Sequence, residues 1–310
     1  MNHKINRRNF LQTAGLGVSL TTLGGVTCIA SAAQETATAT PAAMKLGMVT
    51  YNMGKDMSVD QLITLCKASG LAGVELRTTH AHGVEVSLSP EERAVVRKKF
   101  ADSGVIIAGL GSAFEYHSDN PEEVEKNVRE SIEYARLAAD VGASGIKVRP
   151  NGIPKREDPE ITLERIGKAW GKVAAAAADL GVQVRMEVHG AEQTRNLANM
   201  RKMLDYANHP NATVCWNSNA SDMDENGSIR TNFDLVKHAL GQVHITDIGV
   251  YQYPWQELFT LLKENNFGGF CLAEIAENPD PERFMKYYRT LFDLYTGGYR
   301  YPNPDVYAKG

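Results

Sequence analysis

Cysteine is scarce in this chain, with four in 310 residues. Three of them, Cys66, Cys215 and Cys271, lie beyond the N-terminal leader described below, and an odd number is a poor basis for disulfides. Cys215 and Cys271 fall in expected strands, where each would be a small buried thiol. We therefore do not expect a disulfide framework.

A strong charge excess is missing as well, because the formal net charge is only −4. A chain without a basic excess is a poor partner for nucleic acid, so we expect none. Outside the leader there is no low-complexity segment, and we find no short-period repeat. The length suits one barrel domain or two smaller domains.

The N-terminal leader has the features of an export signal. Residues 6–12, NRRNFLQ, resemble the twin-arginine motif, and a mildly apolar run rich in glycine and threonine follows over 14–30. Residues 30–32, ASA, offer a cleavage site of the A-x-A kind. A transmembrane anchor is the alternative, but the run is short and glycine-rich for one. We predict a signal peptide over 1–32, a linker over 33–44, no stable membrane insertion and a periplasmic location.

Strand and helix patterns alternate from Lys45 onward, with strands about thirty residues apart. Such alternation requires parallel strands with right-handed crossovers. A doubly wound sheet would need a glycine-rich loop after its first strand, and residues 51–54, YNMG, are not one. The sequence therefore predicts an α/β fold, a single-domain (β/α)8 TIM barrel over 45–296 followed by a tail over 297–310. The expected strands are 46–51, 73–77, 105–110, 144–148, 182–190, 212–217, 242–246 and 269–275.

The fifth expected strand, VQVRMEVHG over 182–190, carries polar residues on one face. Arg185, Glu187 and His189 alternate with apolar residues. Neither face of a barrel strand should reach bulk water, so a carboxylate there needs a partner. Glu187 is expected to bind a divalent cation at the barrel mouth. The alternative is a buried ion pair with Arg185.

Four consecutive strands end in a residue that can bind a metal. Chemistry in such barrels belongs at the C-terminal ends of the strands. The donors are oxygen and imidazole, which suit one divalent ion such as Mn²⁺, Mg²⁺, Co²⁺ or Zn²⁺. The predicted metal ligands are Glu187, Asn217, His244 and Glu274.

These residues resemble those of the xylose-isomerase-like TIM barrels of sugar isomerases and epimerases, a superfamily that includes AP endonucleases. The resemblance covers roughly 45–294 and rests on Glu187 in MEVHG, His244 in HITD, and Glu274 after paired glycines. It implies four metal ligands, Glu, Asp, His and Glu, of which the two glutamates also move protons on opposite faces of the sugar. The endonuclease branch fits poorly, because it needs more His and Asp ligands than this chain can place.

The chain departs from the family pattern at three positions. Asn217 stands where the family has Asp, Ala220 where it has a sugar-contacting His, and Val250 where it often has Arg. An amide offers an oxygen without charge, so metal affinity should fall. The reaction or the substrate is therefore expected to differ from ordinary ketose epimerisation, and a metal-free, degenerate site is the alternative.

Further polar residues are expected to complete the pocket. Lys147 would hold a sugar oxygen or act as a base; its alternative is a pair with Glu75 or Glu187 in the barrel core. For Glu115 and His117 the alternative is a solvated loop. The predicted catalytic residues are Glu187, Glu274 and Lys147. The predicted substrate-binding residues are His189, Arg149, Asn219, Glu115, His117, Asp247 and Tyr251.

Together these features predict a metal-dependent isomerase or epimerase that acts on a non-phosphorylated sugar through an enediolate. The chain has no glycine loop dedicated to phosphate, and phosphosugars are not expected outside the cytoplasm. The partner is thus a small-molecule sugar or keto-glycoside. One alternative is a lyase that eliminates a group β to the carbonyl of a 3-keto-glycoside. A second is a sugar-binding protein without catalysis, and homo-oligomerisation is left open.

Overall fold

The computed structural model of the chain describes residues 43–249 and 252–299. The predicted signal peptide over 1–32, the linker as far as residue 42 and the tail from residue 300 onward lie outside these ranges. Within the described ranges, no helix is long and apolar enough to cross a membrane.

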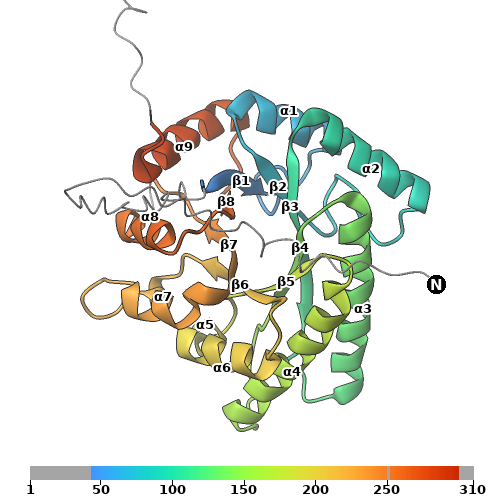
Figure 1. The fold of residues 1–310 in the computed structure, drawn as a ribbon, viewed down its shortest axis with the longest axis vertical. Coiled ribbons are helices and arrows are strands. Elements are labelled where there is room, and N and C mark those ends of the chain that lie inside the picture. The colour runs from blue at the N-terminus through green and yellow to red at the C-terminus, as the bar shows by residue number, and fades with distance from the viewer. Residues whose placement is uncertain (1–42, 250–251, 300–310) are drawn as a thin grey trace, which may run out of the picture. The chain divides into compact units, whose positions relative to one another are not determined.

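Eight parallel strands close into a barrel in sequence order, so the predicted (β/α)8 fold is confirmed. The barrel closes where β1 pairs with β8, and in Figure 1 the helices form a ring around the strands. The strands are β1 (Lys45–Val49), β2 (Gly73–Arg77), β3 (Ile106–Glu115), β4 (Gly145–Arg149), β5 (Gln183–Glu187), β6 (Ala212–Asn217), β7 (Leu240–Ile245) and β8 (Phe270–Ala273).

The helices begin and end where the capping residues place them. Ser58 and Ser89 each form a capping box with the residue three positions later, at the starts of α1 and α2. Both helices end at glycines of positive φ, Gly70 and Gly104. The helices are α1 (Val59–Ser69), α2 (Pro90–Ser103), α3 (Pro121–Val141), α4 (Pro159–Ala178), α5 (Glu192–Arg195), α6 (Leu197–Ala207), α7 (Arg230–Val236), α8 (Trp255–Glu264) and α9 (Pro281–Thr296), with 3-10 turns η1 (Ala220–Asp222) and η2 (Lys237–Ala239).

The fifth and eighth strands are shorter than expected, since β5 ends at Glu187 and β8 at Ala273, and two other elements differ more. β3 continues to Glu115, because Glu115 pairs with Arg149 of β4 in register and through an ion pair. The sequence pattern predicts one continuous helix over 192–207, after β5. In the structure this helix is broken at Asn196, whose backbone is extended and whose side chain accepts hydrogen bonds from two N–H groups of α6. The Asn196 side chain thus begins a new helix where sequence periodicity predicts a continuous one.

The two faces of β5 are both buried, as predicted. Val184 and Met186 are fully buried, and the Trp170 indole of α4 donates to the Val184 carbonyl. On the other face, the Arg185 guanidinium crosses the barrel interior and donates to the Ala108 carbonyl of β3. A Cβ on Gly145 would lie 2.6 Å from Arg185 Cζ, so glycine in β4 leaves the room that this side chain fills.

Candidate active site

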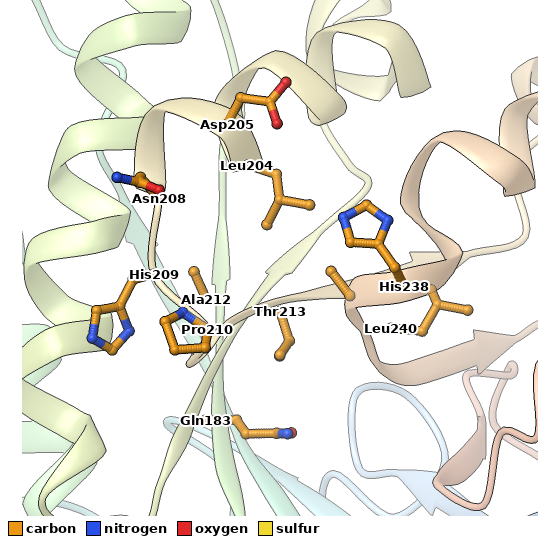
Figure 2. Close-up of a pocket in the computed structure, with 11 residues that line it drawn as sticks. Gln183, Leu204, Asp205, Asn208, His209, Pro210, Ala212, Thr213, His238 and Leu240 are labelled. Carbon is orange, nitrogen blue, oxygen red and sulfur yellow. The ribbon is translucent and has the colours of Figure 1, made fainter.

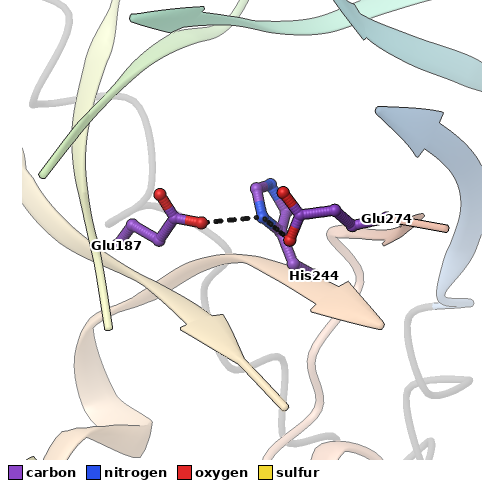
Figure 3. A group of neighbouring side chains, drawn as sticks. All are labelled: Glu187, His244 and Glu274. Atoms are coloured by element: carbon purple, nitrogen blue, oxygen red, sulfur yellow. Dashed lines mark ion pairs between the residues drawn. The ribbon is translucent and has the colours of Figure 1, made fainter. Parts of the chain in front are cut away.

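The carboxyl ends of β5, β7 and β8 bring three side chains together (Figure 3). His244 Nδ1 lies 3.3 Å from Glu187 Oε1 and 3.4 Å from Glu274 Oε2. One ligand atom from each residue lies within 4.8 Å of the others. Glu187 and His244 are buried, whereas 22% of the Glu274 side chain is exposed. The predicted convergence of these strand ends is therefore present.

Asn217 completes the set at the end of β6, beside His244 in the register of β6 and β7. Its Nδ2 lies 3.4 Å from Glu187 Oε1. In this orientation the amide nitrogen faces the cluster, and a half-turn of the amide would present the oxygen instead. Asn217 is thus placed to reach the same point as the other three residues.

Lys147 pairs with Glu187 inside the barrel. Its Nζ lies 2.6 Å from Glu187 Oε2, and both side chains are almost fully buried. Burial opposes a charge on Glu187, but Lys147 and His244 hold its pKa well below the ordinary value. Burial likewise opposes the charge on Lys147, and Glu187 raises its pKa. The two groups are therefore an ionised pair, and the partner of Glu187 is Lys147 rather than Arg185.

The cluster has the properties of a cation site. Among the described residues, no group makes a hydrogen bond to the buried Nδ1 of His244, which faces two carboxylate oxygens. Glu75, Glu187 and Glu274 surround the ring with three carboxylates, and Lys147 and Arg185 supply two cations nearby. Burial opposes a charge on the ring, but the negative groups around it, Glu75 and Glu274 among them, raise the pKa of His244 well above its ordinary value. With the ring neutral, as a metal ligand must be, the count leaves one negative charge in excess. Oxygen and imidazole donors with surplus negative charge fit a divalent ion.

A second polar group lies one layer further out, at the ends of β3, β4 and β5. Arg149 Nη2 lies 2.7 Å from Glu115 Oε1, and His117 Nδ1 lies 3.6 Å from the other oxygen of Glu115. His189 follows Glu187 by two residues, and burial lowers its pKa, so its ring is neutral. Within the described part of the chain, buried nitrogens of Arg149, His117 and His189 have no hydrogen-bond partner. Glu115 and His117 are half-buried rather than fully solvated.

Two of the remaining predicted substrate-binding residues, Asn219 and Asp247, make hydrogen bonds to the backbone of the loops, and the third cannot be placed. Asn219 Nδ2 donates to the carbonyls of Val188 and Asn217, so it joins the loops after β5 and β6. Asp247 Oδ1 accepts the N–H of Gly249. Tyr251 lies outside the described residues.

Sequence reasoning did not identify the role of Glu75 or Gln242, which lie directly beneath the cluster. Glu75 Oε2 lies 3.3 Å from His244 Nε2 and accepts a hydrogen bond of 2.5 Å from Gln242 Nε2. Both residues are buried. The sequence pattern that indicates Gln242 is the two-residue period of a strand, which puts Gln242 on the same face of β7 as His244.

A hollow lined by both polar and apolar residues lies at the other end of the barrel (Figure 2). It is lined by the beginnings of β5, β6 and β7, including Gln183, Ala212 and Leu240, and by the end of α6. Catalytic residues of such barrels lie at the carboxyl ends of the strands. This hollow is therefore not the candidate active site.

Comparison with known proteins agrees with this architecture. A family model described as a xylose isomerase-like TIM barrel matches residues 63–291. A comparison with curated proteins returns no match.

Solved structures with the same fold include several sugar epimerases. The 3-keto-D-glucoside 4-epimerase YcjR from E. coli is 15% identical, with a TM-score of 0.67 over 81% of this chain and 99% of that one. An L-ribulose 3-epimerase is 14% identical, with a TM-score of 0.69 over 82% and 95%. The IOLI protein with a bound zinc atom is 15% identical, with a TM-score of 0.64 over 84% and 100%. At these identities the likeness shows the shared fold.

Proposed function

This chain belongs to the xylose isomerase-like TIM barrel family, and from that premise we propose that it is a divalent-metal-dependent isomerase or epimerase of a non-phosphorylated sugar. The observation that carries the proposal is the cluster of Glu187, His244 and Glu274 at the carboxyl ends of three strands. Sugar epimerases among the structures of the same fold support the substrate class.

Glu187, His244 and Glu274 would hold the metal ion, with Asn217 as a neutral fourth ligand. A bound divalent ion supplies Lewis acidity, which polarises a carbonyl and stabilises the negative charge that develops beside it. Because Asn217 adds no charge, this site binds the ion more weakly than a site with four charged or imidazole ligands.

The two glutamates would move the protons. Glu187 is ionised and therefore able to accept a proton from the carbon next to the sugar carbonyl. Glu274, with 22% of its side chain exposed, would take a proton from solvent and deliver it from the opposite side, which inverts that carbon or moves the carbonyl. Glu187 would then release its proton to solvent, which restores both carboxylates. Lys147 stays protonated beside Glu187, so its role is to keep that carboxylate ionised and to donate a hydrogen bond to a sugar oxygen.

The outer layer would orient the substrate. Arg149, His117 and His189 carry buried nitrogens that lack hydrogen-bond partners in the described ranges, and sugar hydroxyls satisfy such groups. Glu115 neutralises Arg149 through their ion pair, which favours an uncharged sugar over a phosphosugar.

A second candidate is a lyase that acts on a 3-keto-glycoside. The observation in its favour is Lys147, a buried ammonium group 2.6 Å from the proposed base, because expelling a group β to the carbonyl requires a proton for the departing oxygen. The fold is also that of a 3-keto-D-glucoside 4-epimerase. The same proton abstraction by Glu187 begins either reaction.

Incubation with ketohexoses and 3-keto-glucosides in D₂O tests the proposal. NMR should detect an epimer or isomer with deuterium on the carbon next to the carbonyl, and a lyase would instead release the aglycone. Glu187→Gln and Glu274→Gln should each lower turnover by at least about 100-fold. Glu277→Gln is the matched control, because Glu277 is exposed and pairs with Lys55. Sugar binding without exchange in the unaltered protein would contradict catalysis and support a binding protein.

A further inference from the structure

The two ring nitrogens of His244 have different surroundings. Nδ1 faces the oxygens of Glu187 and Glu274 at the strand ends. Nε2 faces the barrel interior, where Glu75 Oε2 lies at 3.3 Å and Gln242 Nε2 at 3.2 Å. The group that binds Nε2 therefore determines what Nδ1 can do.

Arg185, which lies deeper in the barrel, fixes the orientation of the Gln242 amide. Arg185 Nη1 can only donate, and it lies 2.8 Å from Gln242 Oε1. The amide NH₂ must then face the opposite way, where it donates to Glu75 Oε2 at 2.5 Å. Arg185 itself is held by the Ala108 carbonyl and the Ser144 hydroxyl. Hydrogen bonds thus fix the orientation of each side chain in the series Arg185, Gln242 and Glu75.

Glu75 Oε2 supplies the charged acceptor at Nε2. The Cys215 thiol also makes a hydrogen bond with His244, but burial raises the pKa of Cys215, so this sulfur is a neutral and weaker acceptor. The Glu75 carboxylate accepts from the Gln242 amide, and a carboxylate accepts a charge-assisted hydrogen bond about twice as strong as a neutral one. The competing contact, from the Gln242 amide to Nε2, would place the imidazole proton on Nδ1 instead. The charged acceptor wins this competition, so Nε2 carries the proton.

We propose that Glu75 is a positioning residue that keeps the proton of His244 on Nε2 and thereby turns the Nδ1 lone pair toward Glu187 and Glu274. This inference rests on the proposed function in one respect, because it takes the cluster to be a metal site. It assigns no contact between Glu75 and the metal or the sugar. Glu75 acts through the ring of His244, with Arg185 and Gln242 holding it in place.

Zinc binding by calorimetry and nitrogen-15 NMR of labelled histidines test the inference in the purified protein. In the unaltered protein, we expect zinc on Nδ1 of His244 and a proton on Nε2. Glu75→Met removes the acceptor at similar volume and should weaken zinc binding by about 10- to 100-fold. Glu75→Gln keeps a neutral acceptor and should weaken binding by about 10-fold, which gives a second reading if Glu75→Met does not fold. Glu277→Gln is the control, because it neutralises an exposed carboxylate that pairs with Lys55, and it should change zinc affinity less than twofold.

The outcomes separate the two proposals. Zinc affinity and Nδ1 coordination that are unchanged in both Glu75 variants would overturn the positioning role alone. Zinc on Nδ1 in the unaltered protein with no turnover of any sugar would overturn the proposed reaction and leave the positioning role standing. No zinc binding at His244 in the unaltered protein would overturn both.

Discussion

Lys147 Nζ and Glu187 Oε2 lie 2.6 Å apart in the barrel interior, on neighbouring strands. The pair leaves Glu187 Oε1 free to face His244 and Asn217. One oxygen of Glu187 is therefore bound to a fixed cation, and the other is directed at the candidate metal site.

Replacing one partner leaves a buried charge without its counter-ion. Lys147→Met should lower the free energy of unfolding by about 3–5 kcal/mol. Lys147→Met combined with Glu187→Gln should recover part of that loss, because the stranded carboxylate is gone. Urea unfolding measures both variants. Lys172→Met, which removes an exposed pair with Glu125, is the control and should cost about 1 kcal/mol or less. Equal losses for Lys147→Met and Lys172→Met would contradict the buried pair.

Restoring a carboxylate at position 217 should strengthen metal binding. Asn217→Asp adds a charged oxygen beside Glu187 and His244. We expect zinc or manganese to bind at least about ten times more tightly. Asn226→Asp adds the same charge in an exposed turn and is the control. Equal affinity in the two variants would show that position 217 does not reach the metal.

Asp222 should make stability depend on pH. Burial raises the pKa of Asp222 to about 7, although Tyr253 Oη and the Asn219 N–H donate to its Oδ2. The ordinary value of about 4 applies to the unfolded chain. The folded protein thus keeps a proton that the unfolded chain releases between these values. The free energy of unfolding should fall by up to about 4 kcal/mol as pH rises from about 4 to about 7, and then level off.

Urea unfolding between pH 4 and pH 8 measures this decline. Asp222→Asn should remove it, because an amide does not titrate. Asp224→Asn, in the exposed turn that follows, should leave the decline in place. A decline of the same size in Asp222→Asn would assign the effect to another group.

The glycine of β4 should not tolerate a methyl group. A Cβ at Gly145 would lie 2.6 Å from Arg185 Cζ, and Arg185 cannot move aside without losing hydrogen bonds to Ala108, Ser144 and Gln242. Gly145→Ala should lower the free energy of unfolding by about 1–3 kcal/mol. At Gly152 a Cβ would meet its nearest neighbour at 3.6 Å, so Gly152→Ala is the control. A Gly145→Ala protein as stable as the control would refute the tight packing.

The sequence could predict the barrel and the convergence of the candidate site, because both follow from short-range periods. Alternation in the fifth strand puts Glu187 and Arg185 on the inner face, and parallel strands bring the ends at Glu187, His244 and Glu274 to one side of the barrel. Neither prediction requires knowledge of which side chains meet across the barrel.

The partners across the barrel could not be predicted in the same way. Arg185 is two residues from Glu187 on the same face, which made it a natural partner, but its guanidinium extends toward Gln242 one layer below. Glu75 and Gln242 are separated by 167 residues, and no local sequence pattern indicates that their side chains form a hydrogen bond. The break at Asn196 depends on a side-chain cap that competes with helix periodicity.

The metal content of the purified protein after incubation with excess Mn²⁺, Co²⁺ or Zn²⁺ is the decisive test of the proposed metal site. The unaltered protein and the Glu277→Gln control should bind close to one equivalent, and Glu274→Gln should bind little, because the cluster loses one of its two carboxylate ligands. Equal metal content in Glu274→Gln and the control, or none in the unaltered protein, would contradict a metal site formed by Glu187, His244 and Glu274.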